Sequence, residues 1–221
     1  MLHFEAQNLN SFGNGTYRIA AVAEGGFFYE SDSTKPLAVG FGAGFNGEHE
    51  GGNSYRLEGW LGWRPSDRFN ASLEVTYWDR HGWLLHQEDA NFTTFDAEQW
   101  QPKISIEYFI TARQQLRASL QWVGIKAEEK DFYLVPDRPG DLIPTTKPPG
   151  PSDDFSLSQM SLQIRYRWEI APLSDIFLVY TRLADQDTAL GDRDFGDIFR
   201  DAYDAPLENV IVAKIRYRFG S

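Results

Sequence analysis

The sequence predicts an all-β fold, namely an antiparallel transmembrane β-barrel of the outer-membrane type with about nine strands in this chain. Three observations predict it: apolar and polar residues alternate with period two, short and long connections alternate, and aromatic residues gather at the ends of the apolar face. The clearest strand is 159–170, "QMSLQIRYRWEI", in which Met160 and the following even positions to Ile170 are apolar. A helix would scatter these residues around its axis.

Nine segments are predicted as strands, and most are about 10–12 residues long. That length is close to the roughly 9–11 residues that cross a bilayer at a tilt, and it exceeds the average strand of about 5–6 residues. Segment 176–182 is apolar on both faces, so the pattern leaves its register open. The nine segments are 16–30, 36–46, 54–64, 69–79, 103–111, 116–126, 159–170, 176–182 and 208–219.

The connections between these strands alternate in length. Short, polar turns occur at 30–35, 65–67, 112–115 and 171–175, and longer connections occur at 47–52, 80–101, 128–156 and 185–207. An antiparallel meander would place all the short turns at one end and the long surface loops at the other, as outer-membrane barrels do. The long connections are strongly acidic, whereas the rest of the chain has slightly more basic than acidic residues.

The alternation alone leaves open which face meets water. A soluble barrel turns its apolar face inward, whereas a membrane barrel turns it toward lipid. Aromatic residues near the ends of the apolar face favour lipid, because aromatic girdles lie at membrane interfaces. We therefore expect a location in the bacterial outer membrane, with a lipid-facing girdle of Trp63, Tyr108, Trp122, Tyr166, Trp168, Tyr217 and Phe219.

An odd number of strands indicates an incomplete barrel, because a single-chain bacterial barrel has an even number. Residues 1–221 are therefore expected to form one barrel domain or the C-terminal portion of one. Further strands from the same or another polypeptide would close it. The alternative is an additional strand within 1–12 or 83–100, or two strands counted as one.

Composition excludes several other classes. The net charge of −11 argues against nucleic acid as a partner. The absence of cysteine excludes disulfides and thiolate metal sites. The sequence has no run of about 18 apolar residues, so no transmembrane helix is predicted, and the first residues lack the pattern of a signal peptide. No cofactor is expected.

The C-terminal third resembles a known group of proteins. The stretches "YRWEIAPLSDIFLVYTR" and "FGDIFRDAYDAPLENVIVAKIRYRF" are similar to the C-terminal region of large bacterial outer-membrane proteins of unknown function. Those proteins carry an N-terminal carbohydrate-binding-module family-nine-like domain. The resemblance covers roughly 157–219. It implies an outer-membrane location and a sugar-binding-like domain upstream of this chain, and it transfers no catalytic residue.

The best candidate site is a cationic stripe on the polar face, accompanied by one acid. Charged rings tune the selectivity of pores, so this stripe indicates a channel for small polar or anionic solutes. The alternatives are that these cations only pair with Glu58, Glu74, Glu107 and Glu169 across the interior, or that the barrel is a structural or anchoring subunit that pairs with another chain. The candidate residues are Arg117, Arg165, Arg167, Lys214, Arg216, Arg218 and Glu107.

Asp79 and His81 form a weak candidate for hydrolysis. They lie two residues apart at a strand end, and an acid–histidine pair can activate water. An ion pair at the base of a loop explains the same residues more simply. The chain is therefore not expected to be an enzyme, and no catalytic residue is assigned.

The segment 185–207 contains a weak Ca²⁺ candidate, Asp192, Asp194 and Asp197. Clustered carboxylates can hold Ca²⁺, but the spacing is not that of an EF-hand, and a solvated acidic loop is the simpler interpretation. Phe195, Phe199 and Tyr203 recur every four residues, which predicts a short helix over the barrel mouth. The proline-rich segment 135–154 is expected to be extended.

Overall fold

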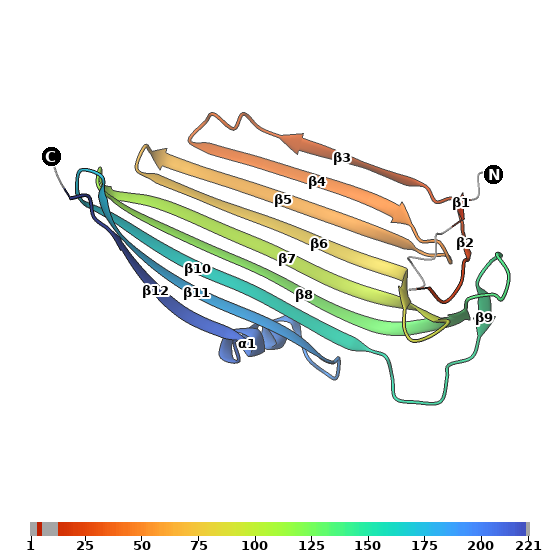
Figure 1. Ribbon diagram of the computed structural model, residues 1–221. Helices are drawn as coiled ribbons and strands as arrows, with labels where there is room; N and C mark the ends of the chain where they lie inside the picture. The colour runs from red at the N-terminus through yellow and green to blue at the C-terminus, as the bar shows by residue number, and fades with distance from the viewer. Residues whose placement is uncertain (1–3, 6–12, 220–221) are drawn as a thin grey trace.

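The fold is an open antiparallel sheet. The computed structural model describes residues 4–5 and 13–219 (Figure 1). Strands make up 68% of it, which confirms the all-β class. Nine strands follow one another in a single hydrogen-bonded path, in the order β12-β11-β10-β8-β7-β6-β5-β4-β3.

The nine strands of this path correspond one to one to the nine predicted segments. They are β3 (Glu24–Glu30), β4 (Leu37–Gly47), β5 (Asn53–Ser66), β6 (Phe69–His86), β7 (Asn91–Thr111), β8 (Gln114–Leu134), β10 (Phe155–Ala171), β11 (Ser174–Ala189) and β12 (Glu208–Arg216). Three short strands lie outside the path. β1 (Phe4–Glu5) pairs with β2 (Arg18–Ile19), and β9 (Ile143–Thr145) pairs with β8.

The first and last strands are shorter than predicted. The first begins at Glu24 rather than 16, because Arg18 and Ile19 pair with β1 instead of with β4. Pairing of the last strand ends at Arg216, opposite Asp175, because its neighbour β11 begins at Ser174. The possible extra strand within 1–12 is represented by β1 alone, and residues 6–12 lie outside the described residues.

The alternation of connections is confirmed, since the four short turns lie at one end of the sheet and the longer connections at the other (Figure 1). However, the predicted loop 80–101 is wrong. β6 continues to His86 and β7 begins at Asn91, so this stretch is mainly the tip of a hairpin. A buried cluster of Phe95, Ala97 and Ala127 stabilises this extension by packing its strands together. Segments 128–156 and 185–207 are likewise partly strand.

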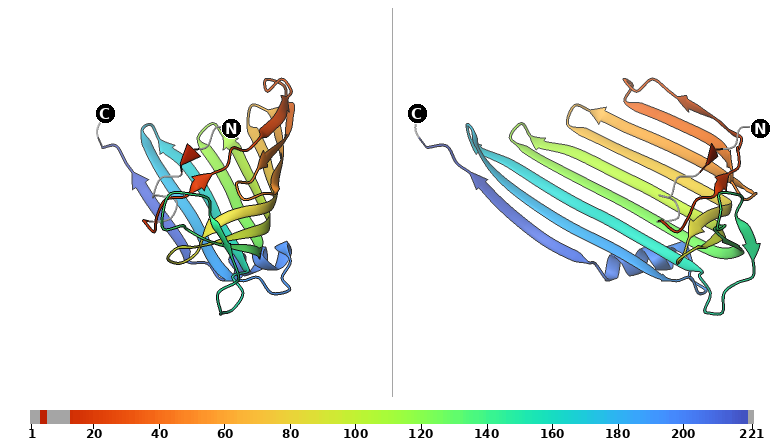
Figure 2. Two further views of the ribbon diagram at one scale, coloured as in Figure 1. Left: turned by 90° about the vertical axis from the view of Figure 1, so that its right-hand side faces the viewer. Right: turned by 45° about the vertical axis from the view of Figure 1, so that its right-hand side comes forward.

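The sheet is curved, but it does not close into a barrel. Within the described residues, β3 pairs only with β4 and β12 pairs only with β11. These two edge strands lie apart at opposite sides of the curved sheet (Figure 2). The outer edges of β3 and β12 are therefore without a neighbouring strand.

The predicted short helix is confirmed as α1 (Phe195–Asp204). Asp194 and Asp197 form a capping box at its N-terminus, and Ile198 and Ala202 are buried. The helix packs against β8, β10 and β11, rather than over a barrel mouth. No helix in the part of the chain that the structure describes is long and apolar enough to cross a membrane.

Trp122 does not have the predicted exposure, because α1 covers it. Its indole is only 7% exposed and contacts the rings of Phe195 and Phe199 edge-on. The indole N–H donates to the Ser158 hydroxyl at 2.9 Å, and that hydroxyl donates to the carbonyl of Ile198 at 2.8 Å. The expectation that Trp122 faces lipid is therefore wrong.

The proline-rich segment 135–154 is tied to the sheet, and within it only β9 is a strand, while bends interrupt the stretches on either side. Val135 and Leu142 are buried in a cluster with Tyr17 and Phe92. The Glu129 carboxylate accepts hydrogen bonds from the Lys147 ammonium and from the backbone N–H of Asp153, the latter at 2.8 Å. Glu129 thus fastens the second half of the segment to β8.

We predict that acid releases this segment. Burial raises the pKa of the Glu129 carboxyl, but the bonds from Lys147 and Asp153 outweigh burial and leave the pKa below its ordinary value of 4.5. The stabilisation is therefore complete above pH 4.5 and lost as the pH falls through the folded-state pKa. Hydrogen–deuterium exchange of the Asp153 backbone amide, corrected for the intrinsic pH dependence of exchange, should accelerate as the pH is lowered past that point. In Glu129→Gln the corrected exchange should be fast at every pH, and an identical pH dependence in this variant would contradict the account.

Candidate functional site: the two faces of the sheet

The register of the sheet separates its side chains into two faces. Leu61, Leu73, Ile104, Leu120 and Leu162 are directly paired across five consecutive strands, and we call their side the apolar face. The opposite side is the polar face. Its residues include one row in which Ser72, Ser105, Ser119, Gln163 and Thr181 are paired in the same way.

The apolar face is largely uncovered in the described part of the chain. Ile104 and Ile106 are each 38% exposed, Leu57 is 56% exposed and Ile211 is 75% exposed. Monomeric soluble proteins rarely expose a continuous apolar patch of more than a few hundred Å². α1 covers this face only near the end that carries the long connections. The apolar face therefore needs an apolar environment that these residues do not supply.

Aromatic pairs mark both ends of this face. The rings of Tyr77 and Trp100 lie 4.8 Å apart at one end. Phe69 lies 5.3 Å from Trp63 and 6.2 Å from Tyr108 at the end with the short turns.

Between Phe69 and Tyr77 on β6, the residues on the apolar face are Ala71, Leu73 and Val75. Eight steps of about 3.3 Å separate the two rings along the strand, or about 26 Å. Beyond Tyr77, the same face carries Asp79 opposite Glu98. The apolar face therefore has an aliphatic belt bounded by aromatic rings, and at one end by charge.

The structure places the remaining predicted girdle residues near the short-turn end of the apolar face. Trp63, Tyr108 and Trp168 are exposed, and Tyr166 is half-buried. The rings of Tyr217 and Phe219 contact each other at 4.9 Å, just beyond the last residue of β12.

Several cations on the polar face are held by acids, among them Arg117 from the predicted set. Arg117 pairs with Glu107 at 2.6 Å, and Lys103 pairs with Glu74 at 3.1 Å. Arg56 pairs with Glu58 at 3.4 Å. Pairing with acids, the alternative interpretation of the cations on this face, therefore accounts for part of the polar face. Glu169 makes no ion pair within the described residues.

Asp175 is a further acid in this site, which sequence reasoning missed. Its side chain is 1% exposed and accepts from the guanidinium groups of both Arg167, at 2.9 Å, and Arg216. Its position in the turn "APLSD" gave no sign of this role. The alternation of faces could have found it. Asp175 falls on the polar face of β11 and lies directly opposite Arg216 once β11 and β12 are paired.

Two predicted cations have no such partner. The side chains of Arg165 and Lys214 make no hydrogen bond or ion pair within the described residues, although Arg165 lies directly opposite Arg117. Arg218 lies past the end of β12, where its backbone N–H donates to the Ser174 hydroxyl at 3.0 Å.

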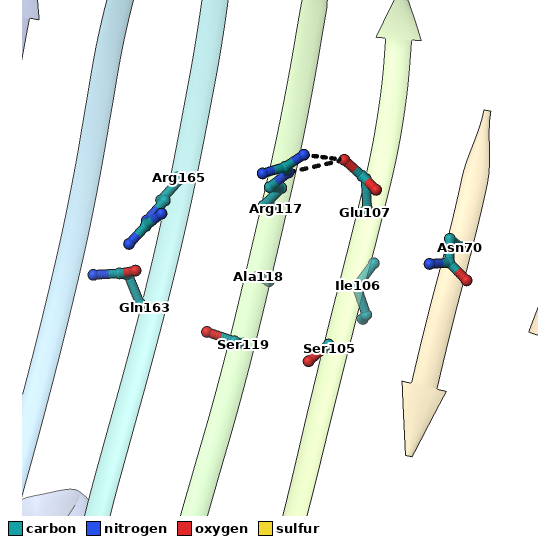
Figure 3. Close-up of a pocket in the computed structure, with 9 residues that line it drawn as sticks. All are labelled: Asn70, Ser105, Ile106, Glu107, Arg117, Ala118, Ser119, Gln163 and Arg165. Carbon is teal, nitrogen blue, oxygen red and sulfur yellow. Dashed lines mark hydrogen bonds and ion pairs between the residues drawn. The ribbon is translucent and has the colours of Figure 1, made fainter. Parts of the chain in front are cut away.

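Two neighbouring grooves on the polar face share Arg117 and Arg165. The first, about 340 Å³, is lined by residues of β6, β7, β8 and β10, which include hydroxyl and amide side chains such as those of Ser105 and Ser119 (Figure 3). The second, about 740 Å³, extends across β11 to β12 and is also lined by Arg167, Lys214 and Arg216. The arrangement can attract an anion, because its positive charge exceeds that of its acids.

Asp79 and His81 are brought together, as their spacing suggested. The Nε2 atom of His81 lies 3.3 Å from Asp79, and its Nδ1 atom lies 3.5 Å from Asp96. A bulge at Gly82, whose φ is +83°, interrupts the pairing of β6 and β7 beside them. Asp96 also lies 3.7 Å from Lys130. These contacts link β6, β7 and β8 in the part of the sheet that the sequence predicted as loop. We assign them no catalytic role.

The acidic residues near α1 serve the helix. Asp194 and Asp197 form its capping box, and Asp197 also pairs with Arg200 at 3.2 Å. Among the described residues, no group of three or more acidic or histidine side chains is arranged to hold a metal ion.

We predict that Asp175 is a structural acid. Asp175→Asn removes the shared counter-charge of Arg167 and Arg216 from a side chain that is 1% exposed, and should lower the free energy of unfolding by more than the loss of a single exposed ion pair does. Glu58→Gln is the matched control. It breaks a longer and more exposed pair, and should cost about 0–1 kcal/mol. Urea unfolding measures both, and equal losses would contradict the assignment.

No curated protein and no solved structure matches this chain. A family is nevertheless matched over nearly the whole chain, residues 3–219, and its description is "Domain of unknown function (DUF5916)". The chain therefore belongs to this family of unknown function.

Proposed function

We propose that this sheet is the membrane-spanning wall of a β-barrel in the bacterial outer membrane. Its apolar face would meet lipid and its polar face would line a water-filled interior. The observation that carries the proposal is the exposed aliphatic belt between the Tyr77–Trp100 pair and the cluster of Trp63, Phe69 and Tyr108. Along a strand tilted by about 35–45° this belt would be about 20 Å tall, which approaches the apolar band of about 25 Å between the aromatic girdles of transmembrane barrels.

The opposite arrangement, in which the apolar face is a soluble core, is less well supported. It would require a second layer over the whole apolar face, and α1 occupies only one end of that face. It would also expose to bulk water the ion pairs of the polar face, which contribute little when fully solvated. A polar interior, by contrast, is satisfied by pairs such as Lys103–Glu74 and Arg117–Glu107.

The proposal requires partner strands at β3 and β12. An unpaired backbone N–H or C=O group costs several kcal/mol in hydrocarbon, so a spanning sheet must have no free edge. Additional strands from the same or another polypeptide would therefore pair with the outer edges of β3 and β12 and close the barrel.

The cations of the polar face favour a channel for small polar or anionic solutes, because charged side chains in a lumen set its selectivity. The open edges favour a second candidate, a structural or anchoring subunit that pairs with another chain. Conductance in a planar bilayer distinguishes the two. A channel conducts, whereas an anchoring barrel with a filled interior survives in mild detergent as a stable complex and does not conduct.

We predict that a charge is tolerated on one face only. Ile104→Arg places a cation on the aliphatic belt and should destabilise the protein in a bilayer by about 2–4 kcal/mol. Ser105→Arg, one residue further along β7, places the same side chain on the polar face and should have a much smaller effect. Urea unfolding in vesicles and recovery in the outer-membrane fraction measure both variants.

The neighbouring substitution controls for the size of arginine and for its poor fit to a strand. Equal tolerance of the two variants would contradict the assignment of faces. The reverse order, with Ser105→Arg the more damaging, would favour the soluble arrangement with an apolar core.

A further inference from the structure

We propose that the polar face carries a binding site for an oxyanion, the carboxylate or phosphate group of a small polar solute, with Arg165 and Lys214 as its binding residues. The inference rests on the proposed function, in which this face lines the interior, and it adds where a solute binds and which chemical group is recognised. The site lies in the larger groove, between β8 and β12.

The cations of the larger groove are of two kinds, those held by an acid and those without one within the described residues. Glu107 fixes Arg117, and Asp175 fixes both Arg167 and Arg216. Arg165 and Lys214 line the same groove, but their side chains contact no acid within the described residues. A cation whose charge is already neutralised gains less from a ligand, so the two free cations are the ones that an anion would bind.

Two cations of the groove lie opposite each other in the sheet. Arg165 lies directly opposite Arg117 across the β8–β10 pairing. Like charges at directly opposed positions destabilise a sheet. The groove is lined by five cations, Arg117, Arg165, Arg167, Lys214 and Arg216, while the acids that hold them are Glu107 and Asp175. Three positive charges remain after these two acids are counted, and a bound oxyanion would offset this excess.

The floor of the larger groove is apolar. Between Arg165 and Lys214, the residues of β11 and β12 on the polar face are Phe177, Val179 and Val212. These side chains supply no counter-charge, and an apolar surface strengthens electrostatic attraction by excluding water. The guanidinium of Arg167 lies 6.0 Å from the centre of the Phe177 ring, which helps to keep it along this floor.

The smaller groove adjoins the larger one at Arg117 and Arg165 (Figure 3). Its lining includes Ser105, Ser119, Gln163 and Asn70. These neutral side chains can donate to and accept from hydroxyl groups. A solute whose oxyanion rests beside Arg165 could therefore place hydroxyl groups along this row, which favours a hydroxylated acid or a phosphorylated polyol over a simple ion.

The experiment uses the full-length polypeptide that contains this chain, with inorganic phosphate and gluconate as the two probes. Binding is measured by calorimetric titration in detergent at constant ionic strength, and separately as block of chloride current in a planar bilayer. The variants are Arg165→Gln, Lys214→Gln and the double change. Arg64→Gln is the control, because Arg64 is a cation of β5 outside both grooves and bonds the carbonyl of Thr34.

Each single variant should bind the preferred probe roughly tenfold more weakly, since a charge-assisted hydrogen bond is lost. Arg64→Gln should bind like the unchanged protein, and Arg165→Lys should recover part of the loss. Preference for phosphate or for gluconate identifies which oxyanion the site takes. Unchanged binding in a folded double variant would overturn the proposal, as would failure of the unchanged protein to bind either probe.

The two readouts separate this inference from the proposed function. A protein that conducts chloride but does not bind the probes through Arg165 and Lys214 is a channel without this site. A protein that binds them through these residues but does not conduct has the site without being a channel, and the anchoring function then holds.

Discussion

The cross-strand register is the constraint on which the rest of this structure depends. Side chains alternate between faces along a strand, so slipping one strand by a single residue would move all of its apolar residues to the other face. The pairing of Leu61, Leu73, Ile104, Leu120 and Leu162 fixes that register over five strands. Every feature of the two faces, from the aromatic ends to the paired charges, follows from it.

The same register explains how a highly charged sheet is stable. It sets Glu107 opposite Arg117 and Glu74 opposite Lys103, so opposite charges meet at directly paired positions. Such pairs stabilise a sheet, and they satisfy polar groups in an interior with limited water. The register also brings like charges together, as it does for Arg165 and Arg117 on the polar face. At this pair of cations the polar face can do more than neutralise itself.

Much of this architecture could be predicted from sequence because alternation is local. The segment 159–170 shows its two faces without reference to any neighbour, and the period of Phe195, Phe199 and Tyr203 identified α1. What failed depends on contacts between distant residues. The burial of Trp122 depends on a helix more than 70 positions away, and the strand extension around Phe95 depends on packing against Ala127. Asp175 likewise has its role only when β11 and β12 are paired.

The central claim is that the apolar face meets lipid, and cysteine scanning along β7 tests it most directly. Residues 1–221 contain no cysteine, so each single-cysteine variant between positions 103 and 109 introduces one labelling site into this chain. In the assembled protein, a lipid-soluble probe should reach positions 104, 106 and 108, and a water-soluble reagent should reach 103, 105 and 107. This period-two alternation is the predicted result. Positions 104, 106 and 108 shielded from the lipid-soluble probe would contradict the account, because another protein layer would then cover the apolar face.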